Sequence, residues 1–314
     1  MVFADPAYAD LYASQVRLIT TDYSLKFDAL RPSREVFDFA NADALLAFGQ
    51  KNRLPMRGHT LVWNENAPQW LHGLPGREVE RIFDEHIEKV VSRYAGKLHS
   101  WDVVNEPFWP EHQKEGGYRN GPWLEAMGPA YVERAFKRVA AIDPGVKLCL
   151  NEAHCENDNA YGKSIRPRLL NLVDRLLDAG IRLDAVGLQC HLQPDIPRDN
   201  AFVRSYIEKI GGGQVDVYIT ELDVNDAPFA GSIAERDAQS AREYENFLNE
   251  ILKAPRVTAV ILWELSDKYT WYLSLPKVRE NLARRAPRPL PFDERMQPKL
   301  AHAAIARALA NRHV

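Results

Sequence analysis

The 314-residue sequence lacks the features that mark several common classes of protein. Its three cysteines include no Cys-x-x-Cys pair, so they do not form a disulfide framework. No apolar run is long enough to cross a membrane, and the first residues, MVFADP, do not read as a signal peptide. The net charge of −3 excludes the cationic face that binds nucleic acid or acidic membranes. We therefore expect a monomer that binds neither nucleic acid nor membrane.

Several catalytic motifs are also missing. No GxGxxG follows an apolar run, since the three glycines at 211–213 precede one. The sequence has no Gly-rich phosphate loop and no GxSxG, which argues against phosphoryl transfer and serine hydrolysis. HExxH is absent, and His154 with Cys155 lacks further ligands at a useful spacing, so His154 is expected to be an ordinary loop residue. We expect no metal and no cofactor.

What the sequence does contain is a repeated alternation of two patterns, in a chain that is 46% hydrophobic and can bury a sizeable core. Apolar runs rich in β-branched residues occur at 16–20, 55–63, 97–105, 146–151, 183–191, 215–223 and 257–265. Amphipathic stretches occur at 83–94, 131–142, 168–180, 200–210, 235–252 and 298–310. This alternation predicts a parallel sheet with crossover helices.

With Val2-Phe3-Ala4 as a short first strand, the chain has eight strands. The sequence therefore predicts an α/β protein with a single (β/α)8 TIM-barrel domain over residues 1–314, whose first strand is short or incomplete. An open doubly wound sheet is the alternative, and the missing GxGxxG counts against it.

Polar side chains stand at the carboxyl ends of most of these runs. In SWDVVNEP, residues 100–107, a strand-like stretch ends on Asn105 and Glu106, and Pro107 cannot continue the ladder. A single glutamate at a strand end is ordinarily a solvated surface residue. The carboxyl ends of barrel strands, however, meet on one face, where the active site lies. The residues at these ends are Lys26, His59, Trp63, Asp102, Asn105, Glu106, Asn151, Glu152, Gln189, His191, Glu221, Asp223 and Trp263.

Two of these residues, Glu106 and Glu221, end the fourth and seventh predicted strands and so face each other across the barrel mouth. Glycosidic bond cleavage requires two facing carboxylates, one to protonate the leaving oxygen and one to attack the sugar or activate water. A structural ion pair is the alternative for Glu221. With His191 and Gln189 on the same rim, we favour the catalytic interpretation.

Five ordered motifs carry a resemblance to a known family. RGHTLVW (57–63), SWDVVNEP (100–107), GLQCH (187–191), ITELDV (219–224) and SDKYTW (266–271) together resemble glycoside hydrolase family 10, the endo-β-1,4-xylanases. The resemblance implies a secreted or periplasmic enzyme that cleaves internal bonds of xylan and xylo-oligosaccharides with retention.

The resemblance also implies roles for individual residues. Glu221 is the nucleophile, Glu106 is the acid/base about 5–5.5 Å away, and His191 with Asp223 behind it orients the nucleophile. Asn105 holds the sugar 2-hydroxyl. The other implied substrate-binding residues are Lys26, His59, Trp63, Gln189, Trp263 and Trp271.

The chain departs from the family pattern around these residues. Where the family usually has TPENEMKW, this chain has TTDYSLKF at residues 20–27, so that Asp22 and Tyr23 replace a sugar-binding Glu-Asn pair. The family's usual WHSQ is Trp63-Asn64-Glu65-Asn66 in this chain. Its usual NDYN is Asn151-Glu152-Ala153-His154, which removes a tyrosine from the leaving-group side. The usual glycine after Trp263 is Glu264. We expect Asp22, Tyr23 and Asn66 to bind substrate in remodelled outer subsites, with Tyr23 favouring short substrates or products.

Three alternatives stay open. One is another retaining β-glycosidase on the same barrel, such as a β-glucanase or an exo-acting xylosidase. Another is a catalytically silent carbohydrate-binding barrel, which the retention of both glutamates opposes. The third concerns the basic residues Lys277, Arg279, Arg284, Arg285 and Arg288, which would attract uronic-acid branches of xylan if they overhang the cleft and otherwise form a solvated face.

Overall fold

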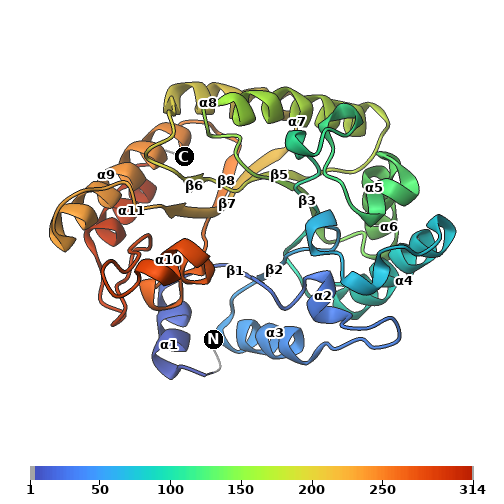
Figure 1. Cartoon of the computed structure of the whole chain (residues 1–314), viewed down its shortest axis with the longest axis horizontal. Helices are drawn as coiled ribbons and strands as arrows, with labels where there is room; N and C mark the ends of the chain where they lie inside the picture. The colour runs from blue at the N-terminus through green and yellow to red at the C-terminus, as the bar shows by residue number, and fades with distance from the viewer. Residues whose placement is uncertain (1–3, 313–314) are drawn as a thin grey trace.

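A computed structural model describes residues 4–312 of the chain, in which helices surround a curved parallel sheet (Figure 1). The strands are β1 (Ile19–Thr20), β2 (Met56–Gly58), β3 (Ser100–Asn105), β4 (Lys147–Glu152), β5 (Ala185–Leu188), β6 (His191–Leu192), β7 (Asp216–Val224) and β8 (Val257–Leu262). The α-helices are α1 (Pro6–Gln15), α2 (Phe27–Leu30), α3 (Ala40–Asn52), α4 (Gly76–Tyr94), α5 (Pro122–Met127), α6 (Ala130–Ile142), α7 (Ala160–Asp178), α8 (Asn200–Lys209), α9 (Ile233–Ile251), α10 (Pro276–Asn281) and α11 (Leu300–Ala310).

The strands pair in the order expected of a barrel. Every pairing between these strands is parallel, from β1 through β2, β3, β4 and β5 to β7 and β8. β6 also pairs with β7 and continues the direction of β5 after two residues, so β5 and β6 occupy one position of the ring. The predicted (β/α)8 architecture is confirmed, and residues 4–312 supply seven of the eight ring positions.

The ring is open between β1 and β8, which are not paired with each other in the described part of the chain. A cavity of about 740 Å³ lies there, lined by Ile19, Ala259 and Ile261 among other residues. The strand predicted at Val2-Phe3-Ala4 lies largely outside the described residues, and Ala4 itself is in a turn. The run at 16–20, which we took for the second strand, is therefore β1.

The contact between β2 and β3 explains a glycine in the RGHTLVW motif. Trp101 on β3 is fully buried, and its ring lies over Gly58, to which Trp101 is paired in register. A Cβ atom at Gly58 would approach this ring to 2.3 Å, which no side chain can accommodate. Gly58 therefore lets a large aromatic residue fill the core directly beneath the strand ends.

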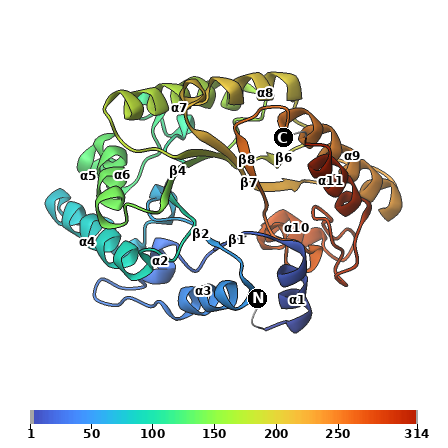
Figure 2. The same ribbon diagram turned by 180° about the vertical axis from the view of Figure 1, so that it is seen from behind.

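The predicted elements differ from the structure in extent. The runs at 55–63 and 257–265 form shorter strands than expected, because their carboxyl-terminal parts leave the sheet, and only the last two residues of the run at 16–20 form a strand. The helices α1 and α3 were not expected. All three cysteines are free and buried, including Cys155 in its polar stretch. No helix between residues 4 and 312 is long and apolar enough to cross a membrane. Figure 2 shows the same arrangement from behind, with helices around the outside of the strands.

Candidate active site

A cleft of about 890 Å³ lies at the carboxyl ends of the strands. The predicted site residues that line it are Asp22, Tyr23, Lys26, His59, Trp63, Asn105, Glu106, Gln189, His191, Glu221, Trp263 and Trp271. Asp223 is fully buried behind the cleft wall. Asn66 is not among the residues that line the cleft, and its side-chain oxygen accepts a hydrogen bond from the Asp28 backbone N–H at the start of α2 (3.4 Å). Its role in binding substrate stays a prediction.

A short chain of amides connects Glu106 to Glu221. The Gln189 side-chain nitrogen donates to Glu106 Oε1 (2.7 Å) and to Asn105 Oδ1 (3.4 Å). The Asn151 nitrogen donates to the same Asn105 oxygen (2.8 Å) and to Glu221 Oε1 (2.8 Å). Because both bonds to Asn105 end on its oxygen, its NH2 group is the part of the amide that can donate to a ligand.

The orientation of the Asn151 side chain is set by the Thr220 hydroxyl. Its oxygen accepts a hydrogen bond from the Thr220 hydroxyl (2.7 Å), which leaves the NH2 group for Asn105 and Glu221. A Cβ atom at Gly187 would approach the Asn151 oxygen to 2.2 Å, so the glycine of GLQCH leaves room for this side chain. Asn151 was noted at a strand end but was not assigned to the site, and the structure places it in contact with Glu221.

Glu221 and His191 form a hydrogen-bonded pair. His191 Nε2 lies 3.2 Å from Glu221 Oε2, and Nδ1 lies 2.9 Å from Asp223 Oδ2. Burial opposes a charge on His191, but Asp223 and Glu221 raise the pKa of His191 well above its usual value. Burial would raise the pKa of Glu221, but the His191 hydrogen bond, the two nearby imidazoles and the Asn151 amide lower it to about 2. Glu221 is therefore an ionised carboxylate at neutral pH.

Asp223 also holds an aromatic wall of the cleft. The Trp271 indole N–H donates to Asp223 Oδ2 (2.7 Å), and the Tyr272 hydroxyl donates to Oδ1 (3.2 Å). Trp263 meets the His59 ring edge to face, with centroids 5.4 Å apart. Fixed rings of this kind offer flat apolar faces to a sugar.

Glu106 has a charged neighbour that the sequence did not reveal. Arg119, from the loop between β3 and α5, is 2% exposed and forms ion pairs with both Glu106 and Glu65. Its Nε donates to the Glu106 backbone oxygen (3.1 Å). Burial, and then the charge of Glu106, raise the pKa of Glu152 well above its usual value. Arg119 is far from any predicted strand end, so no local pattern pointed to it.

The cleft end near Ala153, where the family tyrosine is missing, is lined by aromatic and imidazole side chains. Trp109 and His154 line this end together with Ala153, with ring centroids 6.3 Å apart. The Tyr161 ring packs edge to face against Trp109 at 5.2 Å. His154, which we took for an ordinary loop residue, therefore lies on the cleft wall.

At the opposite end, Glu264 enters the cleft beside Asp22 and Tyr23. Its side chain accepts a hydrogen bond from the Trp271 backbone N–H (2.8 Å), and Glu264 is 8% exposed. Its φ of +75° is a left-handed conformation that favours glycine. Burial, and then the charge of Asp22, raise the pKa of Glu264 to about 9. Glu264 is therefore protonated at neutral pH and can donate a hydrogen bond into the cleft.

Replacing Glu264 by glutamine should stabilise the protein increasingly as the pH rises from 5 to 9. Across this window the unfolded chain has lost the Glu264 proton while the folded protein keeps it. The free energy of unfolding of the unmodified protein therefore falls by up to about 1.4 kcal/mol per pH unit. Glutamine keeps the acceptor for Trp271 and removes this titration. Urea denaturation at several pH values measures the effect. Glu88→Gln on the outer helix α4 is the control, and an equal difference at pH 5 and pH 8 would contradict the assignment.

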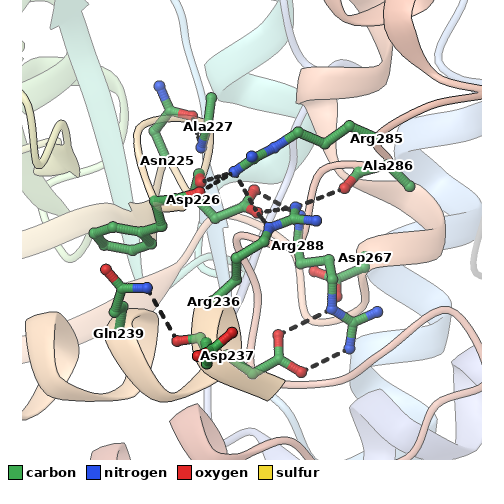
Figure 3. A network of polar contacts seen from close by, with 12 residues as sticks. Asn225, Asp226, Ala227, Arg236, Asp237, Gln239, Asp267, Arg285, Ala286 and Arg288 are labelled. Atoms are coloured by element: carbon green, nitrogen blue, oxygen red, sulfur yellow. Dashed lines mark hydrogen bonds and ion pairs between the residues drawn. The ribbon is translucent and has the colours of Figure 1, made fainter. Parts of the chain in front are cut away.

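Two of the five basic residues after β8 bond to other parts of the protein. Arg285 donates to the backbone oxygens of Asp226 (2.7 Å) and Phe229 (2.6 Å), and Arg288 forms a two-bonded ion pair with Asp237 (both 2.9 Å), as Figure 3 shows. Arg279 alone of the five basic residues lines the cleft. The hypothesis that this segment as a whole binds acidic branches is therefore wrong for Arg285 and Arg288.

Residues 4–312 contain no group of three or more His, Cys, Asp or Glu side chains arranged to hold a metal ion. The chemistry available in the cleft is that of two carboxylates. One is ionised and held by an imidazole, and the other is in contact with an arginine and an amide.

Comparisons with known proteins match the whole of this architecture. The sequence pattern of glycosyl hydrolase family 10 matches residues 2–308. The chain is 32% identical over 319 residues to endo-1,4-beta-xylanase A of Thermoanaerobacterium saccharolyticum, covering 96% of this chain and 25% of that protein. It is 29% identical over 300 residues to endo-1,4-beta-xylanase B of Thermotoga neapolitana, covering 95% and 82% respectively. The chain thus spans about a quarter of the first relative's length and most of the second's.

Solved structures agree with the sequence comparison. Xylanase 10B from Thermotoga maritima superposes with a TM-score of 0.85 at 28% identity, covering 98% of this chain and 90% of that one. Xylanase 10B from Thermotoga petrophila, solved in complex with xylobiose, gives a TM-score of 0.85 at 28% identity, with coverage of 98% and 89%.

Proposed function

Because the chain belongs to glycosyl hydrolase family 10, we propose that it cleaves internal β-1,4-xylosidic bonds of xylan by a retaining double displacement. The observation that carries this proposal is the ionised Glu221, held by His191 and Asn151 and linked through amides to Glu106. Enzymes of this family are typically extracellular, and we propose that this one acts as a secreted or periplasmic monomer with one catalytic domain over residues 1–314.

In the first step, a Glu221 oxygen bonds to the anomeric carbon while the bond from that carbon to the leaving oxygen breaks. Glu106 gives its proton to the leaving oxygen, and a covalent glycosyl-enzyme remains. Low proton affinity suits Glu221 to this role, because an ionised carboxylate is the attacking form. The positive charge on His191 stabilises the free carboxylate and keeps it oriented toward the cleft.

In the second step, Glu106 accepts a proton from water, and the water oxygen replaces Glu221 at the anomeric carbon from the opposite face. Gln189 and Arg119 contact Glu106 and are available to hold it as a carboxylate at this stage. Asn105 lies between the two glutamates with its NH2 group free to donate, which suits it to the sugar 2-hydroxyl. Lys26, His59, Trp63, Gln189, Trp263 and Trp271 form the surrounding sugar-binding surface.

A second candidate is an exo-acting or short-oligosaccharide-specific enzyme on the same site. The observation that favours it is the crowding of one cleft end by Tyr23, which is 55% exposed, and by Glu264. Both side chains stand where the family pattern has smaller or different residues, and we propose that they shorten the run of sugars bound at this end.

Time-resolved hydrolysis of xylohexaose tests both proposals in one experiment. We expect first-formed products in the β-anomeric form, seen by proton NMR, and a mixture of internal cleavage products by chromatography. Release of xylose or xylobiose alone from the first minutes would favour the exo-acting candidate, and replacing Tyr23 by asparagine should then shift the products toward longer fragments. First-formed α-anomers would contradict the retaining mechanism, and faster hydrolysis of β-glucan than xylan would contradict the substrate.

A further inference from the structure

One buried guanidinium beside the cleft forms ion pairs with two carboxylates. Arg119 forms ion pairs with Glu106 and with Glu65, which lies in the 3₁₀ turn after Trp63. The flat face of this guanidinium packs on the Trp109 ring at 4.1 Å from its centroid, and its Nε is held by the Glu106 backbone oxygen. The Arg119 side chain is 2% exposed, whereas that of Glu65 is 56% exposed. Arg119 is therefore fixed between a cleft carboxylate and a surface carboxylate.

We propose that Glu65 is a positioning residue for the acid/base Glu106, acting through Arg119 so that Glu106 can be protonated without leaving a buried cation unpaired. This inference rests on the proposed function, in which Glu106 both donates and accepts a proton. Glu65 stands where the family pattern has serine, so the second carboxylate on Arg119 is a feature of this chain.

The argument depends on what happens to Arg119 when Glu106 changes its charge. A buried charge that loses its partner is strongly destabilising, because it has given up its hydration. When Glu106 is ionised, Arg119 has two negative partners. When Glu106 is protonated, ready for the first step, Arg119 still has Glu65 and its charge stays compensated. Without Glu65, protonation of Glu106 would leave the guanidinium with no carboxylate, and the ionised form of Glu106 would be favoured.

The other groups around Glu106 do not supply this compensation. Gln189, at the end of β5, is a neutral donor. Burial, and then the charge of Glu106, raise the pKa of Glu152, from β4, well above its usual value, so Glu152 holds its proton more readily than an ordinary glutamate. Glu221, from β7, is negative but is engaged by His191 and Asn151. Within residues 4–312, Arg119 is the cation that forms an ion pair with Glu106.

The pH dependence of kcat/KM on xylohexaose tests the proposal with the variant Glu65→Gln. Glutamine keeps the size of the side chain and its hydrogen-bonding capacity but not the charge. We expect the basic limb of the profile to move to lower pH by about one unit, so that kcat/KM at pH 8 falls by about tenfold. Glu65→Asp keeps the charge and should restore most of the original profile. Glu111 lies in the same loop as Arg119 but forms no ion pair with it. Glu111→Gln therefore removes a nearby charge and should leave the basic limb in place.

The outcomes separate this inference from the proposed function. If Glu65→Gln leaves the basic limb unchanged while Glu106→Gln loses activity on xylohexaose, the mechanism stands and the role of Glu65 is wrong. A rise in KM without a shift of the limb would mean that Glu65, which also lines the cleft, contacts the sugar instead. An equal shift in Glu111→Gln would reduce the effect to general surface charge and likewise overturn the proposal. Loss of activity by Glu65→Gln together with full activity of Glu106→Gln would overturn the proposed function itself.

Discussion

Replacing Glu221 by alanine should lower kcat on xylan by about 10⁴-fold or more, because the covalent step has no other nucleophile. Glu106 lies at the other end of the amide chain, and Asp223 is buried and engaged by His191, Trp271 and Tyr272. Steady-state hydrolysis of xylan and of an aryl xylobioside measures the loss. Binding of xylohexaose, measured by calorimetry, should persist.

Added azide makes the Glu221→Ala test specific to the role. Azide can enter the space left by the carboxylate and attack the anomeric carbon of an activated aryl substrate, which yields the α-glycosyl azide. Glu88→Ala on the outer face of α4 is the matched control and should retain full activity. Xylan hydrolysis at more than a few per cent of the original rate in Glu221→Ala would show that another group is the nucleophile.

Replacing Glu106 by alanine should have a large effect that depends on the leaving group. Hydrolysis of xylan, whose leaving sugar must be protonated, should fall by about 10²–10⁴-fold. An aryl glycoside with an acidic phenol needs little protonation, so formation of its glycosyl-enzyme should be much less affected. The basic limb of the pH profile should also disappear, because the group that titrates is gone. Stopped-flow release of the phenol and steady-state rates measure these quantities.

Azide distinguishes the two glutamates by the configuration of the product. In Glu106→Ala the covalent intermediate on Glu221 still forms, and azide then attacks it from the opposite face to give the β-glycosyl azide. The α-azide in this variant, or equal losses on xylan and on the activated aryl substrate, would contradict the assignment of Glu106 as the acid/base. Together the two variants determine which carboxylate forms the covalent bond.

Much of the site was predictable because its residues stand at the carboxyl ends of the predicted strands. Residues that follow the parallel strands of a barrel converge on one face, so Glu106, Gln189, His191 and Glu221 could be assigned to a common cleft from their positions alone. The same reasoning placed Asp102 at a strand end but did not reveal that it is a buried partner of His59. Asp223 was expected behind His191 from the family resemblance, and it lies 2.9 Å from His191 Nδ1. Whether a strand-end residue faces the ligand or its neighbours depends on the pleat and twist of each strand.

Two of the residues that were missed come from a loop. Arg119 and Trp109 belong to the connection between β3 and α5, whereas Asn151, which was also missed, lies on β4. Loops follow no hydrophobic period, so their side chains cannot be placed from sequence spacing. The contact of Asn66 with the Asp28 backbone N–H at the start of α2 could not be foreseen for the same reason.

The amino-acid sequence by itself determined the α/β barrel, the family and the two facing glutamates, because hydrophobic alternation and strand-end motifs are local patterns along the chain. Tertiary structure alone decided the charge state and the partners of those groups. The pKa of Glu221 depends on His191 and Asn151, and the surroundings of Glu106 depend on Arg119 and Glu65, which come from separate elements. Electrostatic interactions act through space and in proportion to burial, so they exist only once the barrel has brought these side chains together.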